Sequence, residues 1–205
     1  MMMKLTVRAA LLAGAVLGAS GAAAAADLSP GYLGMDVGFR NHYNFDCLSG
    51  SPCERNAGAS TRIYGGYTLG ETLAFGSLKT TRAIEVAAFT GGAVKGAFNH
   101  GGGVLSPGEG KLSGVSVVLA SSSKLSEDWA WTSRLGLVAE HGKVNYTAGG
   151  SDSTNTLAVT VGTGLSYAID RNWSLNADWN YLPARMGKAA KSNLNVFSVG
   201  AAYHF

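Results

Sequence analysis

Apolar and polar side chains alternate along most of the chain after residue 27. Between residues 173 and 181, every second residue is Trp, Leu, Ala, Trp or Tyr, and the residues between them are Ser, Asn, Asp and Asn. The segments 155–169 and 193–205 repeat this period of two. Strict alternation with many Val, Thr, Tyr and Trp residues predicts β-strands that bury one face.

Eight segments carry the pattern, and they predict an all-β fold, an eight-stranded antiparallel up-and-down transmembrane β-barrel. The expected strands are residues 31–43, 60–69, 82–91, 111–123, 129–144, 155–169, 173–182 and 193–205. The connections 126–128 and 170–172 are tight turns. The stretches 44–59, 92–110, 145–154 and 183–192 are longer and rich in Gly, Ser, Asn and Pro. Short turns at one end and long loops at the other are typical of outer-membrane barrels.

The connection 70–81 does not fit this rhythm. It is too long for a tight turn. The start of the third strand is left open here, because Leu73, Phe75 and Leu78 could belong to it.

Alternation alone does not decide whether the apolar face meets lipid or, as in a lipocalin-like soluble barrel, the interior. Charged residues make up only 14% of the chain, against about 25% in soluble domains. The polar face consists mostly of small residues, which fit the narrow interior of eight strands. Aromatic residues are expected at both interfaces: Trp129, Trp131, Trp173, Tyr67, Tyr167 and Phe205 near the short turns, and Trp179 and Tyr181 near the long loops. The apolar face is therefore predicted to face lipid.

Residues 1–26 resemble an export signal that is cleaved before Asp27. Lys4 and Arg8 precede an apolar run, and three alanines end at residue 26. The alternative is a retained membrane anchor. Removal of the signal would leave a barrel domain of residues 27–205 and reduce the net charge from +3 to about +1. This charge and the absence of a basic stripe argue against nucleic-acid binding.

The second half of the chain resembles the OmpA-like transmembrane β-barrels, which are small eight-stranded outer-membrane proteins. The segments RLGLVAEHGKV, VGTGLSYAIDRNWSLNADWNY and NLNVFSVGAAYHF carry the resemblance. It implies a place in the outer membrane and an assembly signal, read by the barrel-assembly machinery, in the alternate residues Phe197, Val199, Ala201, Tyr203 and Phe205. No peptidoglycan-binding domain follows, so a wall-tethering role is not implied.

Seven charged residues fall on the predicted inward face and are expected to form a lumen charge network. They are Asp36, Arg40, Arg62, Glu85, Arg134, Glu140 and Asp178. Charges confined in a narrow interior should pair, because an unpaired buried charge is costly. Arg134 is expected to be the only base at middle depth, with Arg40, Arg62 and Glu140 nearer the long loops. A gate or narrow conducting path is the alternative to simple structural pairs.

Cysteine and histidine supply the other candidates for chemistry. Cys47 and Cys53 are predicted to form a disulfide, because export places them in an oxidising compartment. Free thiols, or metal binding with His42, are the alternatives. Lipid A deacylase barrels use a His and a Ser two positions apart, and none of the four histidines, His42, His100, His141 and His204, has that spacing. An enzyme is therefore not expected, although Ser, His and Glu from distant positions could still meet. No metal or other cofactor is expected.

Basic residues outnumber acidic ones in the predicted long loops and strand tips. The bases are Arg55, Lys95, Lys111, Lys143, Arg185, Lys188 and Lys191, and the acids are Asp46, Glu54, Glu109 and Asp152. Such a rim could bind the phosphates of lipopolysaccharide, although a mixed solvated surface is the equal alternative. The sequence thus predicts a monomeric outer-membrane barrel with a structural or surface-interaction role. A narrow pore and a lipid-modifying enzyme are the other hypotheses.

Overall fold

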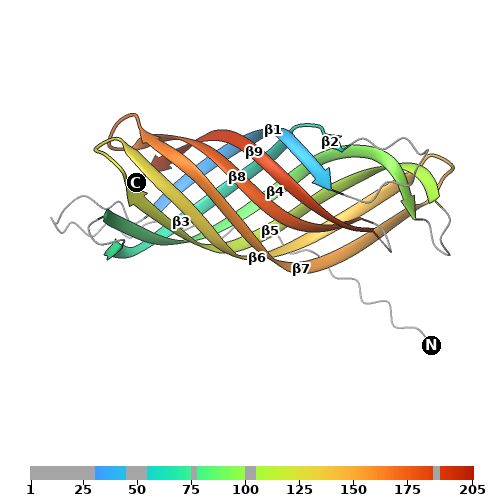
Figure 1. Ribbon diagram of the computed structural model, residues 1–205, viewed down its shortest axis with the longest axis horizontal. Helices are drawn as coiled ribbons and strands as arrows, with labels where there is room; N and C mark the ends of the chain where they lie inside the picture. Colours follow the sequence, from blue (N-terminus) through green and yellow to red (C-terminus); the bar gives the residue numbers. More distant parts are fainter. Residues whose placement is uncertain (1–30, 45–54, 75–77, 100–104, 187–189) are drawn as a thin grey trace.

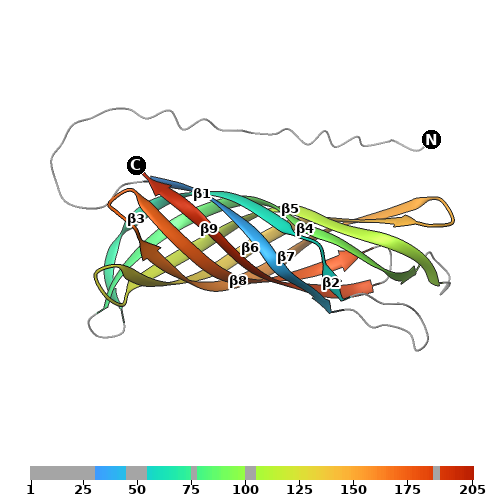
Figure 2. The ribbon, with the colours of Figure 1, turned by 90° about the horizontal axis from the view of Figure 1, so that it is seen from above.

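The computed structural model describes residues 31–44, 55–74, 78–99, 105–186 and 190–205. They form long tilted strands around a common axis (Figures 1 and 2). The strands are β1 (Gly31–Asn44), β2 (Asn56–Ala57), β3 (Ser60–Ala74), β4 (Leu78–Asn99), β5 (Leu105–Lys124), β6 (Trp129–Tyr146), β7 (Ser151–Ala168), β8 (Trp173–Met186) and β9 (Ala190–His204). Among these residues, no helix is long and apolar enough to cross a membrane.

The strands form one closed antiparallel ring. Each long strand pairs with its neighbour in sequence, and β1 pairs with β9 from Tyr32↔His204 to Asn44↔Asn193. The two-residue strand β2 pairs only with the end of β1, so eight long strands make the wall. The predicted all-β, up-and-down barrel is confirmed.

Tight turns join strands at one end of the barrel, here called the turn end. Leu125 and Ile169 each donate a backbone hydrogen bond of 2.9 Å across the turn, to Trp129 and Trp173. The predicted turns 126–128 and 170–172 are therefore confirmed. The opposite end, here called the outer end, carries the β4–β5, β6–β7 and β8–β9 hairpins (Figure 1).

The predicted long loops 92–110, 145–154 and 183–192 are mostly strand, so this part of the prediction was wrong. The β4–β5 ladder continues to Asn99↔Leu105. The β6–β7 ladder continues to Asn145↔Ser151 and ends in a tight turn, where Gly149 and Gly150 adopt φ of +100° and +91°. Gly, Ser and Asn are common in loops, but here neighbouring strands pair their backbone.

The uncertain connection 70–81 also becomes strand on both sides. Leu73 belongs to β3, the second long strand, whereas Leu78 begins the third long strand, β4. Phe75 lies outside the described residues, as do the predicted signal 1–26, both cysteines and His100.

A β-bulge interrupts the alternation of β1. The β1–β9 register shifts between Gly38 and Arg40, so Phe39 is an extra residue on β1. Before the bulge, Asp36 and Gly38 point inward; after it, Asn41 and Tyr43 are the buried residues. One inserted residue reverses which face each later side chain occupies.

The apolar face points outward along the ring. On β7 the exposed row is Leu157, Val159, Val161, Leu165 and Tyr167, whereas Thr160 and Gly162 are buried. At the turn end, Trp129 packs on Tyr167 with ring centroids 5.0 Å apart, and Trp173 on Tyr203 at 5.2 Å. The outward direction and the aromatic girdle at the turn end are thus as predicted.

Glycine permits close packing inside the ring. A Cβ added at Gly136 would collide with the carbonyl oxygen of Val117 on β5. We expect Gly136→Ala to lower the free energy of unfolding by about 1–3 kcal/mol. Urea unfolding in detergent would measure the loss. The control is Gly65→Ala, where an added Cβ meets nothing closer than 3.6 Å. Equal stability of the two variants would contradict the packing described for Gly136.

Candidate functional site

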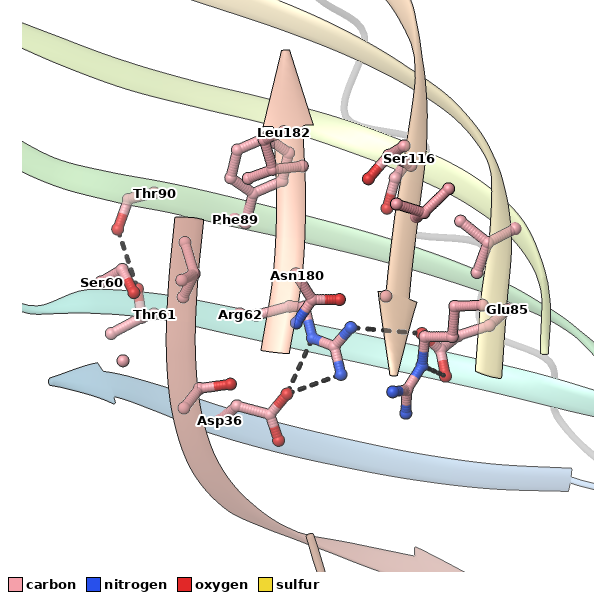
Figure 3. Close-up of a pocket in the computed structure, with 18 residues that line it drawn as sticks. Asp36, Ser60, Thr61, Arg62, Glu85, Phe89, Thr90, Ser116, Asn180 and Leu182 are labelled. Atoms are coloured by element: carbon pink, nitrogen blue, oxygen red, sulfur yellow. Dashed lines mark hydrogen bonds and ion pairs between the residues drawn. The ribbon is translucent and has the colours of Figure 1, made fainter. Parts of the chain in front are cut away.

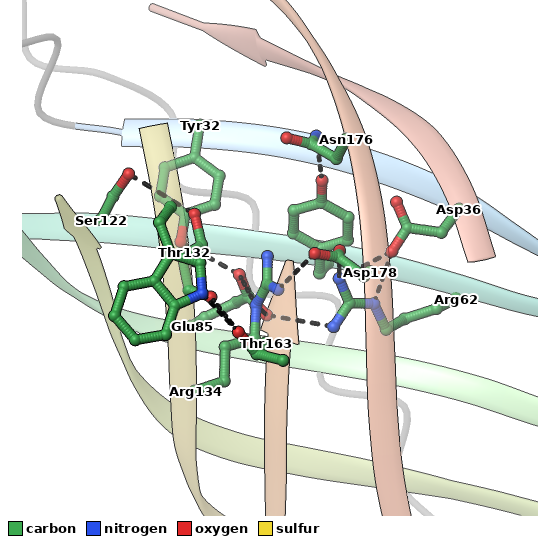
Figure 4. Close-up of polar contacts among 12 residues, drawn as sticks. Tyr32, Asp36, Arg62, Glu85, Ser122, Thr132, Arg134, Thr163, Asn176 and Asp178 are labelled. Atoms are coloured by element: carbon green, nitrogen blue, oxygen red, sulfur yellow. Dashed lines mark hydrogen bonds and ion pairs between the residues drawn. The ribbon is translucent and has the colours of Figure 1, made fainter. Parts of the chain in front are cut away.

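Five charged side chains meet at the middle of the lumen (Figure 4). Arg62 Nε donates to Asp36 Oδ2 at 2.7 Å, and Arg62 Nη2 donates to Asp178 Oδ2 at 3.1 Å. Arg134 Nε donates to Glu85 Oε1 at 3.1 Å, and its Nη1 donates to Asp178 Oδ1 at 2.9 Å. Arg62 Nη1 also lies 3.5 Å from Glu85 Oε1. The five side chains come from strands β1, β3, β4, β6 and β8. The two bases therefore bridge the three acids. We call these five residues the ion network.

The surroundings of the ion network explain how the charges tolerate burial. Asp36 and Glu85 are each 1% exposed, so water does not solvate them. The Tyr32 hydroxyl donates to Glu85 at 3.1 Å. The Tyr64 ring lies 4.5 Å from the Arg62 guanidinium carbon, and Asn176 donates to the Tyr64 hydroxyl at 3.0 Å. Pairing and hydrogen bonding together offset the cost of removing these charges from water.

The ion network contains five of the seven predicted lumen charges. Arg62 lies in the centre beside Arg134, so the prediction that Arg134 is alone at middle depth was wrong. Arg40 is exposed on the outer surface, because the bulge after Gly38 turns it away from the lumen. Glu140 is buried, as expected, but it lies outside the network and has no hydrogen-bond partner among the described residues.

Tyr32, Tyr64 and Asn176 were not assigned to the site from the sequence. Alternation along the sequence does place Asn176 and Tyr64 on the inward face. It does not give their position along the barrel axis, where the pairing of three separate strands brings Tyr32, Tyr64 and Asn176 to one level.

An apolar cluster fills the lumen between the ion network and the outer end. Its members come from β1, β4, β5, β6, β8 and β9, and we call them the plug: Tyr43, Phe89, Val94, Phe98, Leu112, Val138, Val144, Tyr146, Leu182, Ala184, Met186, Leu194 and Val196. Figure 3 shows Phe89 and Leu182 together on one side of Arg62, with Asp36 on the other side. A space of about 40 Å³ lies between the ion network and the plug, room for one or a few waters.

A wider vestibule of about 250 Å³ lies on the turn-end side of the ion network. Its walls include Ser122, Ser166 and Lys124. Ser174 Oγ and His204 Nε2 lie 3.1 Å apart there, and the ring centroids of Tyr32 and His204 are 5.6 Å apart in a tilted arrangement. In a Ser-His-Asp hydrolase triad an acid orients the histidine. The described residues place no carboxylate in hydrogen-bond contact with His204.

Two of the other histidines have amide partners. His42 Nδ1 lies 3.1 Å from Asn56 Oδ1, and His141 Nδ1 lies 2.8 Å from Asn155 Oδ1. In the described part of the chain, no three His, Cys, Asp or Glu side chains are placed to hold a metal ion.

A closed antiparallel ring with an apolar exterior, an aromatic girdle and a polar, ion-paired centre defines a transmembrane β-barrel. Residues 9–205 match the family model described as the outer membrane protein beta-barrel domain. The chain therefore belongs to this family of outer-membrane barrels, in agreement with the OmpA-like resemblance.

Solved barrels share the fold at low sequence identity. Neisserial surface protein A is 17% identical with a TM-score of 0.57, over 86% of this chain and 98% of that chain. Ail, the attachment invasion locus protein of Yersinia pestis, is 15% identical with a TM-score of 0.52, over 85% and 99%. OprG from Pseudomonas aeruginosa is 11% identical with a TM-score of 0.52, over 87% and 97%. No curated protein matches the chain.

Removal of Arg134 should strand buried carboxylates. Arg134→Ala leaves Glu85 and Asp178 with Arg62 as their only guanidinium partner among the described residues. We expect a loss of about 3–5 kcal/mol in the free energy of unfolding. Exposed Arg40 is the matched control, for which Arg40→Ala should change it by less than about 0.5 kcal/mol. Equal effects in urea unfolding would show that the ion network does not support the fold.

Proposed function

We propose that the chain is a sealed, non-catalytic outer-membrane barrel with a structural or surface-interaction role. The observation that carries the proposal is the filled lumen. The ion network and the plug occupy the path between the two ends, and about 40 Å³ remains between them. A filled lumen supports a structural or surface-interaction role better than a transport role.

The hairpins at the outer end support a role in contacts outside the membrane. The β4–β5 and β6–β7 ladders continue past the apolar exterior into segments rich in Gly, Ser and Asn. Lys111 Nζ contacts Glu109 Oε1 at 2.9 Å there, and the hydrogen bond to Lys111 lowers the pKa of this exposed carboxyl. Lys143 adds another exposed charge. Charged, ladder-supported hairpins are suited to bind a partner, for which we propose lipopolysaccharide at the outer rim.

The sealed lumen predicts little ion conductance. In a planar bilayer, the wild-type barrel should give at most small, flickering currents, because the ion network and the plug fill the lumen. Arg134→Ala should increase the current, since it removes one guanidinium from the ion network. A steady, large wild-type current would favour the narrow-pore hypothesis over this proposal.

The β4–β5 and β6–β7 hairpins are expected to make the contacts with partners outside the membrane. Shortening both hairpins tests this expectation. A variant that joins β4 to β5 and β6 to β7 by short turns near residues 92 and 112, and 141 and 155, also loses the plug residues Val94, Phe98, Val144 and Tyr146. It should remain a folded barrel, because the ladders below these turns still close the ring. Folding is checked by a mobility difference between unboiled and boiled samples, which closed barrels show because their ladders resist unfolding. The trimmed barrel should lose partners that the full barrel captures from cell-envelope extracts. Identical capture by both would contradict a hairpin-based role.

The last strand is proposed to guide assembly through Phe197, Val199, Ala201, Tyr203 and Phe205. Four of these, Phe197, Val199, Tyr203 and Phe205, are exposed on the outer face, as an outward signal requires. Deletion of Phe205 should reduce the amount of barrel in the outer membrane more than it reduces the stability of barrel already folded. Immunoblotting of membrane fractions, with urea unfolding of refolded protein as the control, would measure both. Normal membrane levels of the truncated chain would contradict the signal.

A further inference from the structure

The wall of the barrel is open between β7 and β8 at its outer end. Their pairing runs from Ala168↔Ser174 to Val161↔Tyr181 and stops there. Both strands continue: β7 remains paired with β6 as far as Ser151, and β8 with β9 as far as Met186. One edge of β7, from Ser151 to Thr160, therefore has no strand partner among the described residues. In Figure 2 the β6–β7 hairpin lies apart from the end of β8 at the outer end of the barrel.

The opening arises because the β8–β9 end bends across the lumen. Met186 is buried in the plug, and it lies over Gly110 of β5. The carbonyl of Arg185 lies so close to Gly142 of β6 that a side chain there would collide with it. Burial of Leu182, Met186 and Leu194 in the plug thus favours packing against β5 and β6 over pairing with β7.

A cleft of about 680 Å³ occupies the opening. One wall is the free edge of β7, with Thr156, Leu157 and Ala158. The other wall is the outward face of β8, β9 and β1, including Tyr181, Pro183, Arg185, Asn193 and Asn44, and Arg55 lies beside it.

The cleft lies where the apolar exterior ends. The outward apolar row of β7 runs from Tyr167 to Leu157, and the next outward residue is Asn155. These eleven positions match the roughly 9–11 residues with which a tilted strand crosses a bilayer. Leu157 is 71% exposed, and it marks the boundary between hydrocarbon and headgroups.

The chemistry of the cleft is basic on one side and apolar on the other. Arg55 and Arg185 are exposed, and neither makes an ion pair in the part of the chain that the structure describes. Two guanidinium groups beside amide and hydroxyl groups favour a phosphate. Leu157 and Tyr181 provide a surface for acyl chains at the same place.

We propose that this cleft binds a phosphorylated glycolipid of the outer leaflet, with its phosphates at Arg55 and Arg185 and its acyl chains along Leu157. The proposal rests on the outer rim's proposed affinity for lipopolysaccharide and assigns it a site. A soluble anion would use only the arginines. A lipid also uses the apolar side of the cleft, and the boundary position presents both to the leaflet.

The test is a titration of the detergent-folded barrel with purified diphosphorylated lipid A, followed by native mass spectrometry. Arg55→Gln/Arg185→Gln should weaken binding by about a hundredfold, because each of the two charged hydrogen bonds lost costs roughly tenfold. The control Arg40→Gln/Arg82→Gln removes two exposed charges of the same sign outside the cleft lining, and should change binding less than about twofold. Boiled and unboiled mobility confirms that both variants fold.

The other arms identify the occupant. Lipid A without phosphates and the phosphorylated disaccharide without acyl chains should each bind at least about tenfold more weakly than diphosphorylated lipid A. Equal binding of the deacylated disaccharide would replace the lipid by a soluble phosphosugar. Equal loss in the control variant would assign the affinity to net charge and overturn the site. Wild-type barrel that binds no lipid A would overturn the inference, while the conductance and hairpin tests of the proposed function would stand separately.

Discussion

Lipid offers no hydrogen bonds to a backbone, so every amide that crosses the hydrocarbon must find its partner within the protein. Here the pairing of β1 with β9 supplies that condition, because it joins the first and last long strands into a ring. Eight strands enclose a narrow interior that side chains must fill. The charges on the inward face therefore lie within reach of one another, and Arg62 and Arg134 pair with the acids of β1, β4 and β8.

The two halves of the lumen are filled by different kinds of side chain. Toward the turn end, hydroxyls, amides and the ion network leave a vestibule open to water. Toward the outer end, apolar side chains such as Tyr43, Leu112 and Leu194 are packed as in a soluble core. Glu140 is the exception, since it is buried in this half without a hydrogen-bond partner among the described residues. A polar half and an apolar half therefore fill the lumen in series.

Alternation was enough to predict the strands, the ring and the outward apolar face, because period two is a local property of sequence. It also placed Asp36, Glu85, Arg134 and Asp178 inside. It failed at Arg40, since one inserted residue at Phe39 reverses the faces and leaves no trace in composition. It failed for the hairpins as well, because Gly and Ser-rich strands have the composition of loops. The depth of Arg62 depends on register between strands, which a single strand's pattern does not contain.

β7 and β8 separate close to the boundary of the hydrocarbon. Inside the hydrocarbon an unpaired edge would be costly, and the ladder is continuous as far as Val161↔Tyr181, four residues before the boundary at Leu157. Near the headgroups, water and polar lipid groups can satisfy backbone groups, and the cost of an open edge decreases. There the burial of Met186 and Leu194 in the plug outweighs a few ladder bonds, and β8 bends inward. The plug that fills the outer half of the lumen thereby opens the cleft in the wall, so one packing event accounts for both features.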